Sequence, residues 1–289
     1  MIRDPKARAD LEDNFRKTMT QLLAGLATLF AGIVALSAAV IAYLQLSQQQ
    51  KASHELLISN QVSKGFEQLG SGKPAIRLGG IYALEGVMNT SEEYHKPVLE
   101  ALSAFVRDGT RTGTGDGPPA TDIQAALTVI GRRTAIGPGT PNLANAYIPK
   151  ADLSNAELSR ANPSAATPVG ANLSRAELSL ANLSGALMAG TNLTGAHLVN
   201  ANLFGAILFR ANLSGAFLIG TNLSDANLTL ANISDPILAT ANLSGANLTR
   251  TNLTGADLTG ATVSQTQLEE ACGIDVKLDP GLTIKPCRR

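Results

Sequence analysis

The chain has 289 residues, of which 44% are hydrophobic, 4% aromatic and 16% charged, and 23 basic residues balance 23 acidic ones. This composition is too apolar for a disordered chain, and zero net charge argues against an electrostatic grip on nucleic acid by the whole protein. Two cysteines exclude a scaffold of many disulfides and a zinc ribbon. The scarcity of aromatic residues indicates a thin core built from Leu and Ala.

The first predicted element is a membrane span over residues 21–46, preceded by a cytoplasmic segment over residues 1–20. No charged residue occurs between Thr18 and Gln50, and the apolar run 22–44 would form about 34 Å of helix, enough to cross a hydrocarbon core of roughly 30 Å. One alternative is a buried core helix, which rarely has so long an apolar run. The other is a cleaved signal peptide, which would begin nearer the N-terminus.

The charges on either side of this span predict its orientation. Five basic residues precede the span, among them Arg3, whereas the comparable stretch after it has two, Lys51 and Lys64. By the positive-inside rule, the N-terminus lies in the cytoplasm and the rest of the chain lies outside it. We therefore expect a single-pass membrane protein.

Residues 52–133 are predicted to form a small α-helical module. Apolar residues recur at helical spacing within residues 78–88, 98–106 and 123–130. Between the second and third of these stretches, residues 111–120 have the Gly, Pro and Thr content of a loop. The pattern indicates at least three amphipathic helices that pack on one another.

Short motifs in this module are interpreted as structural. Thr121 and Gln124 have the spacing of a capping box, and two glycines at 79–80 would allow a close helix crossing. Residues 70–73 faintly resemble a phosphate loop, but they lack its full spacing and a preceding strand, so we interpret them as a turn between helices. His95, beside two acidic residues, is interpreted as a solvated helix start rather than a metal site.

From residue 141 to residue 268 the sequence repeats every five residues. An apolar residue or Pro stands at every fifth position from Leu143 to Leu268, which we call the centre of each of 26 units, and Ala usually stands two residues before it. A period of five fits a chain that turns a corner in each unit, so that four units close a square coil and each residue stacks on the one 20 positions later. With about 4.8 Å between coils, the rod would be about 31 Å long.

This A-[DN]-L-x-x pattern, as at 151–153, 171–173 and 256–258, closely resembles the pentapeptide-repeat family. The resemblance implies a mainly β fold, a right-handed quadrilateral β-helix, here preceded by a transmembrane helix and the α-helical module. The centre and the residue two before it would face the axis, and the other three positions solvent. The helical stretch and the tail resemble bacterial membrane-anchored members, which implies the bacterial inner membrane. Pro163 and Pro168 depart from the pattern and indicate a distorted early coil.

The solvent-facing positions differ from face to face. Two opposite faces repeat Asn with Ser or Thr, interrupted only by Phe204. A third face carries apolar residues that we call the central patch: Val199, Phe217, Ile219 and Ile237. The face opposite carries a second patch: Leu187, Ile207 and Phe209. Because contiguous exposed apolar surface marks interfaces, we predict that the central patch binds an unknown protein partner or a second copy; drift on a tolerant surface is the alternative.

Residues 269–289 are predicted to be a C-terminal cap and tail. A short helix over 266–272 would cover the open end of the solenoid, as solenoid ends require. Cys272 and Cys287 either pair as a disulfide that closes the tail over the last coil, in keeping with an oxidising compartment, or remain two free thiols in the cytoplasm.

No catalytic constellation stands out, so the sequence predicts no enzyme, no cofactor and no metal site; His197 lies among apolar neighbours without an evident second ligand. The main hypothesis is a non-catalytic, membrane-anchored scaffold or protein–protein interaction module. The alternative, implied by one branch of the family, is a DNA-mimic regulator that binds DNA gyrase, of the quinolone-resistance type. That function needs an acidic rod, whereas residues 141–268 carry five basic and six acidic side chains. Nucleic acid is therefore not an expected partner.

Overall fold

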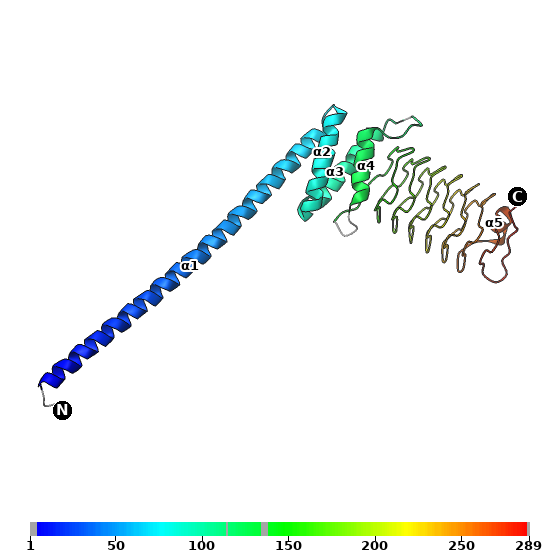
Figure 1. The fold of residues 1–289 in the computed structure, drawn as a ribbon. Coiled ribbons are helices and arrows are strands. Elements are labelled where there is room, and N and C mark those ends of the chain that lie inside the picture. The colour runs from blue at the N-terminus through cyan, green and yellow to red at the C-terminus, as the bar shows by residue number, and fades with distance from the viewer. Residues whose placement is uncertain (1–4, 114, 134–137, 288–289) are drawn as a thin grey trace. The chain divides into compact units, whose positions relative to one another are not determined.

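The computed structural model describes residues 5–113, 115–133 and 138–287. Residues 1–4 and 288–289, which belong to the predicted cytoplasmic segment and tail and include Arg3, lie outside the described residues. The chain divides into two compact units, Met1–Ser59 and Asn60–Arg289, and each is described by itself. Helices of the described residues are drawn in Figure 1.

α1 (Pro5–Leu69) is one continuous helix of 65 residues. The sequence predicted a span ending near residue 46 and a module beginning at 52, but the helix has no break there because residues 33–64 contain neither Gly nor Pro. In the first unit, every large apolar side chain from Leu22 to Leu46 is exposed. The helix is therefore long enough and apolar enough to cross a membrane, and none of its apolar window is buried within the protein.

The second unit begins with a helical module in which α2 (Pro74–Thr90), α3 (Glu92–Thr110) and α4 (Thr121–Arg132) all contact one another. Most residues of the apolar stripes predicted from the sequence face its core, where Leu84, Leu99 and Leu127 are buried, whereas Tyr82 is exposed. Arg77 and Asp122 form an ion pair with 2.5 Å between Nη2 and Oδ2, which ties α2 to α4.

The close helix crossing expected at residues 79–80 is present. A Cβ atom added to Gly80 would lie 2.8 Å from the carbonyl oxygen of Gly65 and 2.8 Å from the amide nitrogen of Leu69. Only glycine fits such a contact between backbones. Gly80 of α2 is thus explained by packing against the end of α1.

The structure corrects two interpretations in this module and confirms a third. His95 is buried, and its Nδ1 lies 2.7 Å from the carbonyl oxygen of Pro138, so the solvated helix start was wrong. The capping box at Thr121 was also wrong, because Ala120 occupies the N-cap and no side chain caps α4. Residues 70–73 do connect two helices, α1 and α2, as a turn.

After the module the chain forms a solenoid in which residues directly before the centres pair with residues 20 positions later. Parallel bridges run from Asn142↔Asn162 to Asp257↔Lys277. The described residues contain no extended strand, and the mainly β expectation is met only by these single-residue bridges. The reason is the corner in every unit, where the second residue after the centre has positive φ, for example Gly205 at 62°. Figure 1 shows the stacked coils.

The solenoid axis is filled as the repeat predicts. The Leu centres and the Ala residues two before them are buried throughout. Thr replaces Ala at 191, 221 and 251, and each buried hydroxyl donates to a backbone carbonyl, for example Thr221 Oγ1 to Leu198 O at 2.7 Å. Pro163 and Pro168 have no N–H to donate to the next coil, and the bridges Asn162↔Asn182 and Thr167↔Leu187 are absent between these described residues. The register of 20 is kept there by Asn182 N and Leu187 N, which donate to Ala161 O and Ala166 O at 2.9 and 2.8 Å.

Candidate interaction surface

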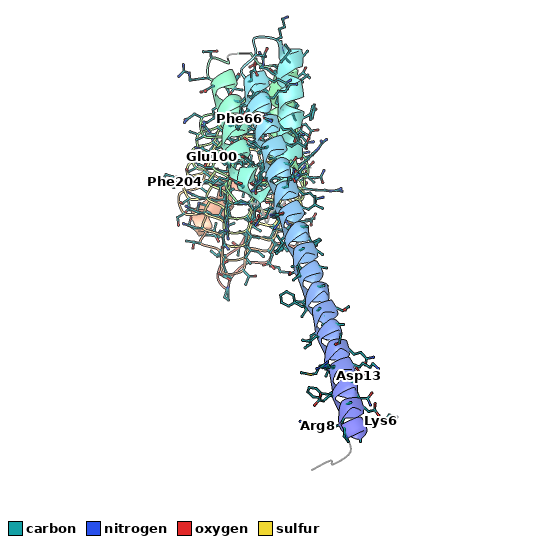
Figure 2. The ribbon with its side chains drawn as sticks, turned by 90° about the vertical axis from the view of Figure 1, so that its left-hand side faces the viewer. Lys6, Arg8, Asp13, Phe66, Glu100 and Phe204 are labelled. Atoms are coloured by element: carbon teal, nitrogen blue, oxygen red, sulfur yellow. A yellow bond between two sulfur atoms is a disulfide. The ribbon has the colours of Figure 1, made fainter. Side chains whose placement is uncertain are left out.

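Two opposite faces of the solenoid, which we call the ladder faces, carry hydrogen-bonded rows of Asn side chains. On one of them Asn202 Nδ2 donates to Asn182 Oδ1 at 3.2 Å, and Asn222 Nδ2 donates to Asn202 Oδ1 at 3.1 Å. Each Oδ1 also accepts from the backbone N–H two residues later, as Asn202 does from Phe204. The amide groups are thus occupied in holding successive coils together. Phe204 projects from this face (Figure 2), with 49% of its area exposed.

The central patch belongs to a column of side chains on another face, which we call the variable column. Its members are the residues directly before successive centres, and bridges link every neighbouring pair: Glu157, Glu177, His197, Phe217, Ile237, Asp257 and Lys277. The structure therefore brings Phe217 and Ile237 side by side on adjacent coils. From the sequence, this column was traced only to Asp257, and Lys277 was missed.

Side-chain contacts connect the members of the variable column. His197 Nδ1 lies 2.9 Å from Glu177 Oε2, and the His197 and Phe217 rings meet edge to face with centroids 4.7 Å apart. Lys277 Nζ lies 3.2 Å from Asp257 Oδ2. An apolar centre is thus flanked by a Glu–His pair on one side and an Asp–Lys pair on the other.

The apolar residues of the central patch remain accessible to a partner. Phe217 is 38% exposed and Ile237 37%, and Ile219, beside them, is also exposed. Val199 is half-buried. Exposed apolar surface of this kind costs free energy in water and favours association.

The two carboxylates that flank the central patch, those of Glu177 and Asp257, have pKa values below their usual range. Partial burial alone would raise the pKa of Glu177, but hydrogen bonds from Ser179 and His197 outweigh it and the pKa is lowered. Hydrogen bonds from Thr259, and then from Lys277, lower the pKa of Asp257. Both groups are therefore held as carboxylates at neutral pH, which gives the two flanks of the patch defined charges.

The second patch is smaller in its accessible apolar area. Leu187 and Ile207 pair across a bridge, and Ile207 is exposed, whereas Leu187 and Phe209 are half-buried. The Arg210 guanidinium carbon lies 5.0 Å from the centroid of the Phe209 ring and covers part of it. The central patch is the better candidate for an interface.

The N-terminal end of the solenoid is closed by side chains of the helical module. An open coil edge would expose backbone N–H and C=O groups. Gln124 of α4 pairs with both groups of Asp152, accepting from its N–H at 3.0 Å and donating to its carbonyl at 2.7 Å. Thr110 Oγ1 accepts from the N–H of Tyr147 at 3.2 Å. This role of the module was not predicted from the sequence.

The end of α4 completes this N-terminal closure. The carbonyl of Gly131 accepts from Glu157 N at 2.8 Å, and a Cβ added to Gly131 would lie 2.8 Å from the Cβ of Ala156. Arg133 is buried, and its Nη2 donates to Ser159 O at 2.9 Å. Burial lowers the pKa of Arg133, although the nearby Glu157 carboxylate opposes that shift.

The C-terminal end is closed by α5 (Gln265–Glu270) and the tail that follows it. The unit centred at Leu268 lies inside α5, so the chain forms a helix there instead of a further corner. Ser264 and Gln267 form a capping box that starts the helix. The helix expected over 266–272 is present with slightly different bounds.

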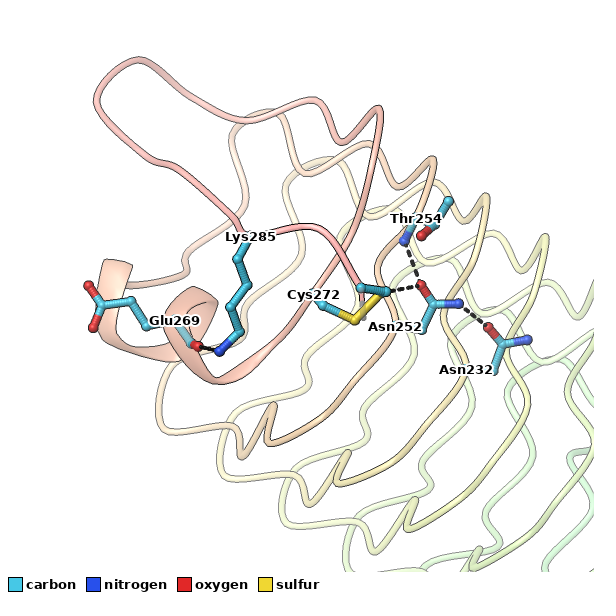
Figure 3. Close-up of a disulfide and its surroundings, with 7 residues drawn as sticks. Asn232, Asn252, Thr254, Glu269, Cys272 and Lys285 are labelled. Carbon is cyan, nitrogen blue, oxygen red and sulfur yellow. Dashed lines mark hydrogen bonds between the residues drawn. A yellow bond between two sulfur atoms is a disulfide. The ribbon is translucent and has the colours of Figure 1, made fainter. Parts of the chain in front are cut away.

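Beyond α5 the tail resumes the five-residue register and pairs with the last coil. Cys272 bridges Asn252, and Lys277 bridges Asp257. A disulfide joins Cys272 to Cys287, at the end of one ladder face (Figure 3). With both ends covered, the faces are the surface of the solenoid that remains for partners.

The geometry defines a solenoid of five-residue units closed by a helical module at one end and a disulfide-linked tail at the other. The family model for pentapeptide repeats matches residues 171–208, 206–235 and 237–272, with eight copies. The chain belongs to the pentapeptide-repeat family. No curated protein matches it.

Several solved structures of pentapeptide-repeat proteins resemble the chain. HetL, involved in heterocyst differentiation regulation in Nostoc sp. strain PCC 7120, is 30% identical, with 50% of this chain and 81% of that chain covered and a TM-score of 0.24. A protein of the Arabidopsis thaliana thylakoid lumen is 28% identical (41% and 79% covered, TM-score 0.26). QnrB1, a plasmid-mediated fluoroquinolone resistance protein, is 20% identical (50% and 79% covered, TM-score 0.33).

Proposed function

We propose that this chain is a non-catalytic, membrane-anchored scaffold whose solenoid presents the central patch to a protein. The observation that carries the proposal is that the chain has both an exposed apolar helix and a rigid solenoid. The ends of the solenoid are closed, and its variable column is apolar at the middle. The division into residues 1–20 in the cytoplasm, 21–46 in the membrane, 52–133 as module, 141–268 as solenoid and 269–289 as cap and tail belongs to this proposal.

The exposure of α1 supports the anchor. A core helix of a soluble protein would be covered by other elements, whereas the apolar window of α1 has none of its area buried within the protein. Water would solvate that surface at a cost of roughly 25 cal/mol per Å². A lipid bilayer removes this cost. The flanking charges then support a bacterial inner-membrane protein with its N-terminus in the cytoplasm and its solenoid outside.

The backbone supports a quadrilateral β-helix, and the resemblance to the family implies its right hand. Four corners with positive φ recur in every 20 residues, and parallel bridges connect each coil to the next. Four flat sides result, which is why the ladder faces and the variable column are distinct surfaces.

The charge of the solenoid argues against the gyrase-binding alternative. A DNA mimic needs a strongly negative rod, whereas five basic side chains nearly balance six acidic ones over residues 141–268. The disulfide between Cys272 and Cys287 also fits a compartment outside the cytoplasm better than a cytoplasmic target.

A topology reporter fused after the last residue tests the proposal. We expect a reporter that is active only outside the cytoplasm, such as alkaline phosphatase, to be active, and a reporter that fluoresces only inside to be dark. The protein should also stay in the membrane fraction after alkaline extraction. Cytoplasmic reporter activity, or release by alkali, would overturn the anchored scaffold.

A further inference from the structure

We propose that the variable column is a self-association surface that binds the variable column of a second copy in antiparallel orientation. The two copies are related by a two-fold axis that passes between the levels of Phe217 and Ile237. This inference rests on the proposed function in taking this face as the interaction surface, and it specifies the partner as the chain itself.

The order of residues in the column supports the antiparallel pairing. Bridges place them on successive coils, one coil apart, at about 4.8 Å per step. An antiparallel copy presents the same residues in reverse order. The side chains that then meet are compatible. Glu177 meets Lys277 of opposite charge, Phe217 meets Ile237, which is also apolar, and the polar His197 meets Asp257.

Each of these contacts occurs twice because a two-fold interface uses the same surface on both copies. The two apolar pairs lie at the centre and the charged pairs lie on either side, which is the arrangement of an apolar core with a polar rim. The side chains at the rim are available for new contacts, since those of His197 and Lys277 are exposed.

The neighbouring column, formed by the residues directly after the centres, fits the same arrangement. In the antiparallel pair Ile219 of one copy meets Ala239 of the other, and Val199 meets Thr259. No charged side chain therefore lies against an apolar one. Ile219 widens the apolar centre of the interface beside Phe217.

Parallel pairing in register is disfavoured by the same residues. It would place Glu177 against Glu177, Asp257 against Asp257 and Lys277 against Lys277. Like charges in contact repel, and such contacts discriminate against an orientation more than they weaken binding in general. The charge pattern therefore selects the antiparallel pair.

The ladder faces do not compete for this role. Their Asn side chains already bond to one another and to the backbone, as at Asn202, and offer little apolar area apart from Phe204. Phe204 provides a matched control, because it is an exposed Phe at a repeat position outside the proposed interface.

The size of the surface sets the expected strength. Six coils span about 24 Å, and a face about 15 Å wide would bury on the order of 400 Å² per copy, below the ~800 Å² typical of stable complexes. The dimer should therefore be weak and should require high protein concentration in detergent.

The test uses the full-length chain in detergent micelles, with sedimentation velocity over a range of concentrations. We expect reversible dimers for the wild type and for Phe204→Asp, and an association at least about tenfold weaker for Phe217→Asp. Circular dichroism and thermal unfolding establish that both variants are folded.

A charge swap tests the orientation. Glu177→Lys and Lys277→Glu should each weaken the homodimer by about tenfold, since two ion pairs become two repulsions. Mixing the two variants should restore dimers, because each contact between positions 177 and 277 then joins one lysine to one glutamate. This rescue cannot come from repaired folding, since both chains keep their substitutions.

The outcomes separate this inference from the proposed function. A wild type that stays monomeric, a dimer that Phe217→Asp leaves intact, or single charge variants that dimerise normally would overturn the antiparallel dimer. A solenoid located outside the cytoplasm together with any of these results would retain the scaffold and lose only its self-association. A cytoplasmic solenoid that still dimerises would retain the self-association and overturn the proposed function.

Discussion

The ladder faces and the variable column are carried by the same coils at equivalent backbone positions, yet their side chains have different tasks. On the ladder faces, Asn182, Asn202 and Asn222 bond to one another, so each side chain contributes to the fold. In the variable column, Phe217 and Ile237 occupy the same positions and are only partly covered. The fold tolerates either set, which teaches that the five-residue repeat fixes the axis and leaves the outward side chains free to differ between faces.

The largest expected effect is a loss of stability when a buried Leu beneath either kind of face is replaced. Leu218→Ala under the variable column and Leu213→Ala under a ladder face should each lower the free energy of unfolding by about 2–5 kcal/mol, because both side chains are fully buried. Chemical denaturation measures this. A loss below about 1 kcal/mol at one site alone would show that the two faces do not share one axis.

Removal of the disulfide that holds the tail should cause the next largest loss of stability. The disulfide closes a 15-residue separation between Cys272 and Cys287 at the end of a ladder face, and its removal should cost about 3 kcal/mol. Reductant should lower the thermal midpoint of the wild type. The double variant Cys272→Ser, Cys287→Ser should start lower and not respond to reductant; equal midpoints in all samples would contradict a role for the tail in closing the coil.

The direct comparison between faces uses one residue from each. Asn202→Ala removes hydrogen bonds to two neighbouring Asn residues and to a backbone N–H, and should cost about 1–3 kcal/mol. Phe217→Asp, in contrast, should cost less, about 0.5–1 kcal/mol, because it removes the ring contact with His197 but no hydrogen bond between coils. Urea unfolding of both variants decides this, and a reversed order of the two losses would remove the distinction between faces.

The smallest effect concerns pH. The pKa of Glu177 is below its ordinary value in the folded chain, so its contribution to stability is present above about pH 4.3 and is lost as the pH falls through the folded pKa. We expect stability to fall less steeply on acidification in Glu177→Gln than in the wild type. Denaturant midpoints measured from about pH 6 to about pH 3 test this, and parallel curves would show that the hydrogen bonds to Glu177 add nothing.

Sequence reasoning reached the features that depend on local periodicity. The five-residue register, the buried Leu and Ala positions and the stacking of each residue on the one 20 later all follow from the repeat, and the structure has them. The grouping of Phe217 with Ile237 follows from the same count. The short helix before the tail was predicted because the open end of a solenoid needs a cap.

Features that depend on contacts between distant segments were missed. Gln124 looked like part of a capping box, but its amide pairs with the backbone of Asp152, which only the docked coil makes available. His95 looked exposed because its sequence neighbours are acidic. Lys277 could have been found, since Ala271 and Leu278 continue the register after α5, but the helix hides that continuity from a pattern search.

The most direct test of the central claim, that the variable column is the recognition surface, is the sedimentation of full-length Phe217→Asp beside Phe204→Asp in the same detergent. We expect Phe204→Asp to associate like the wild type and Phe217→Asp to remain monomeric at the concentrations where the wild type forms dimers. Equal association of the two variants, with both folded, would contradict the claim.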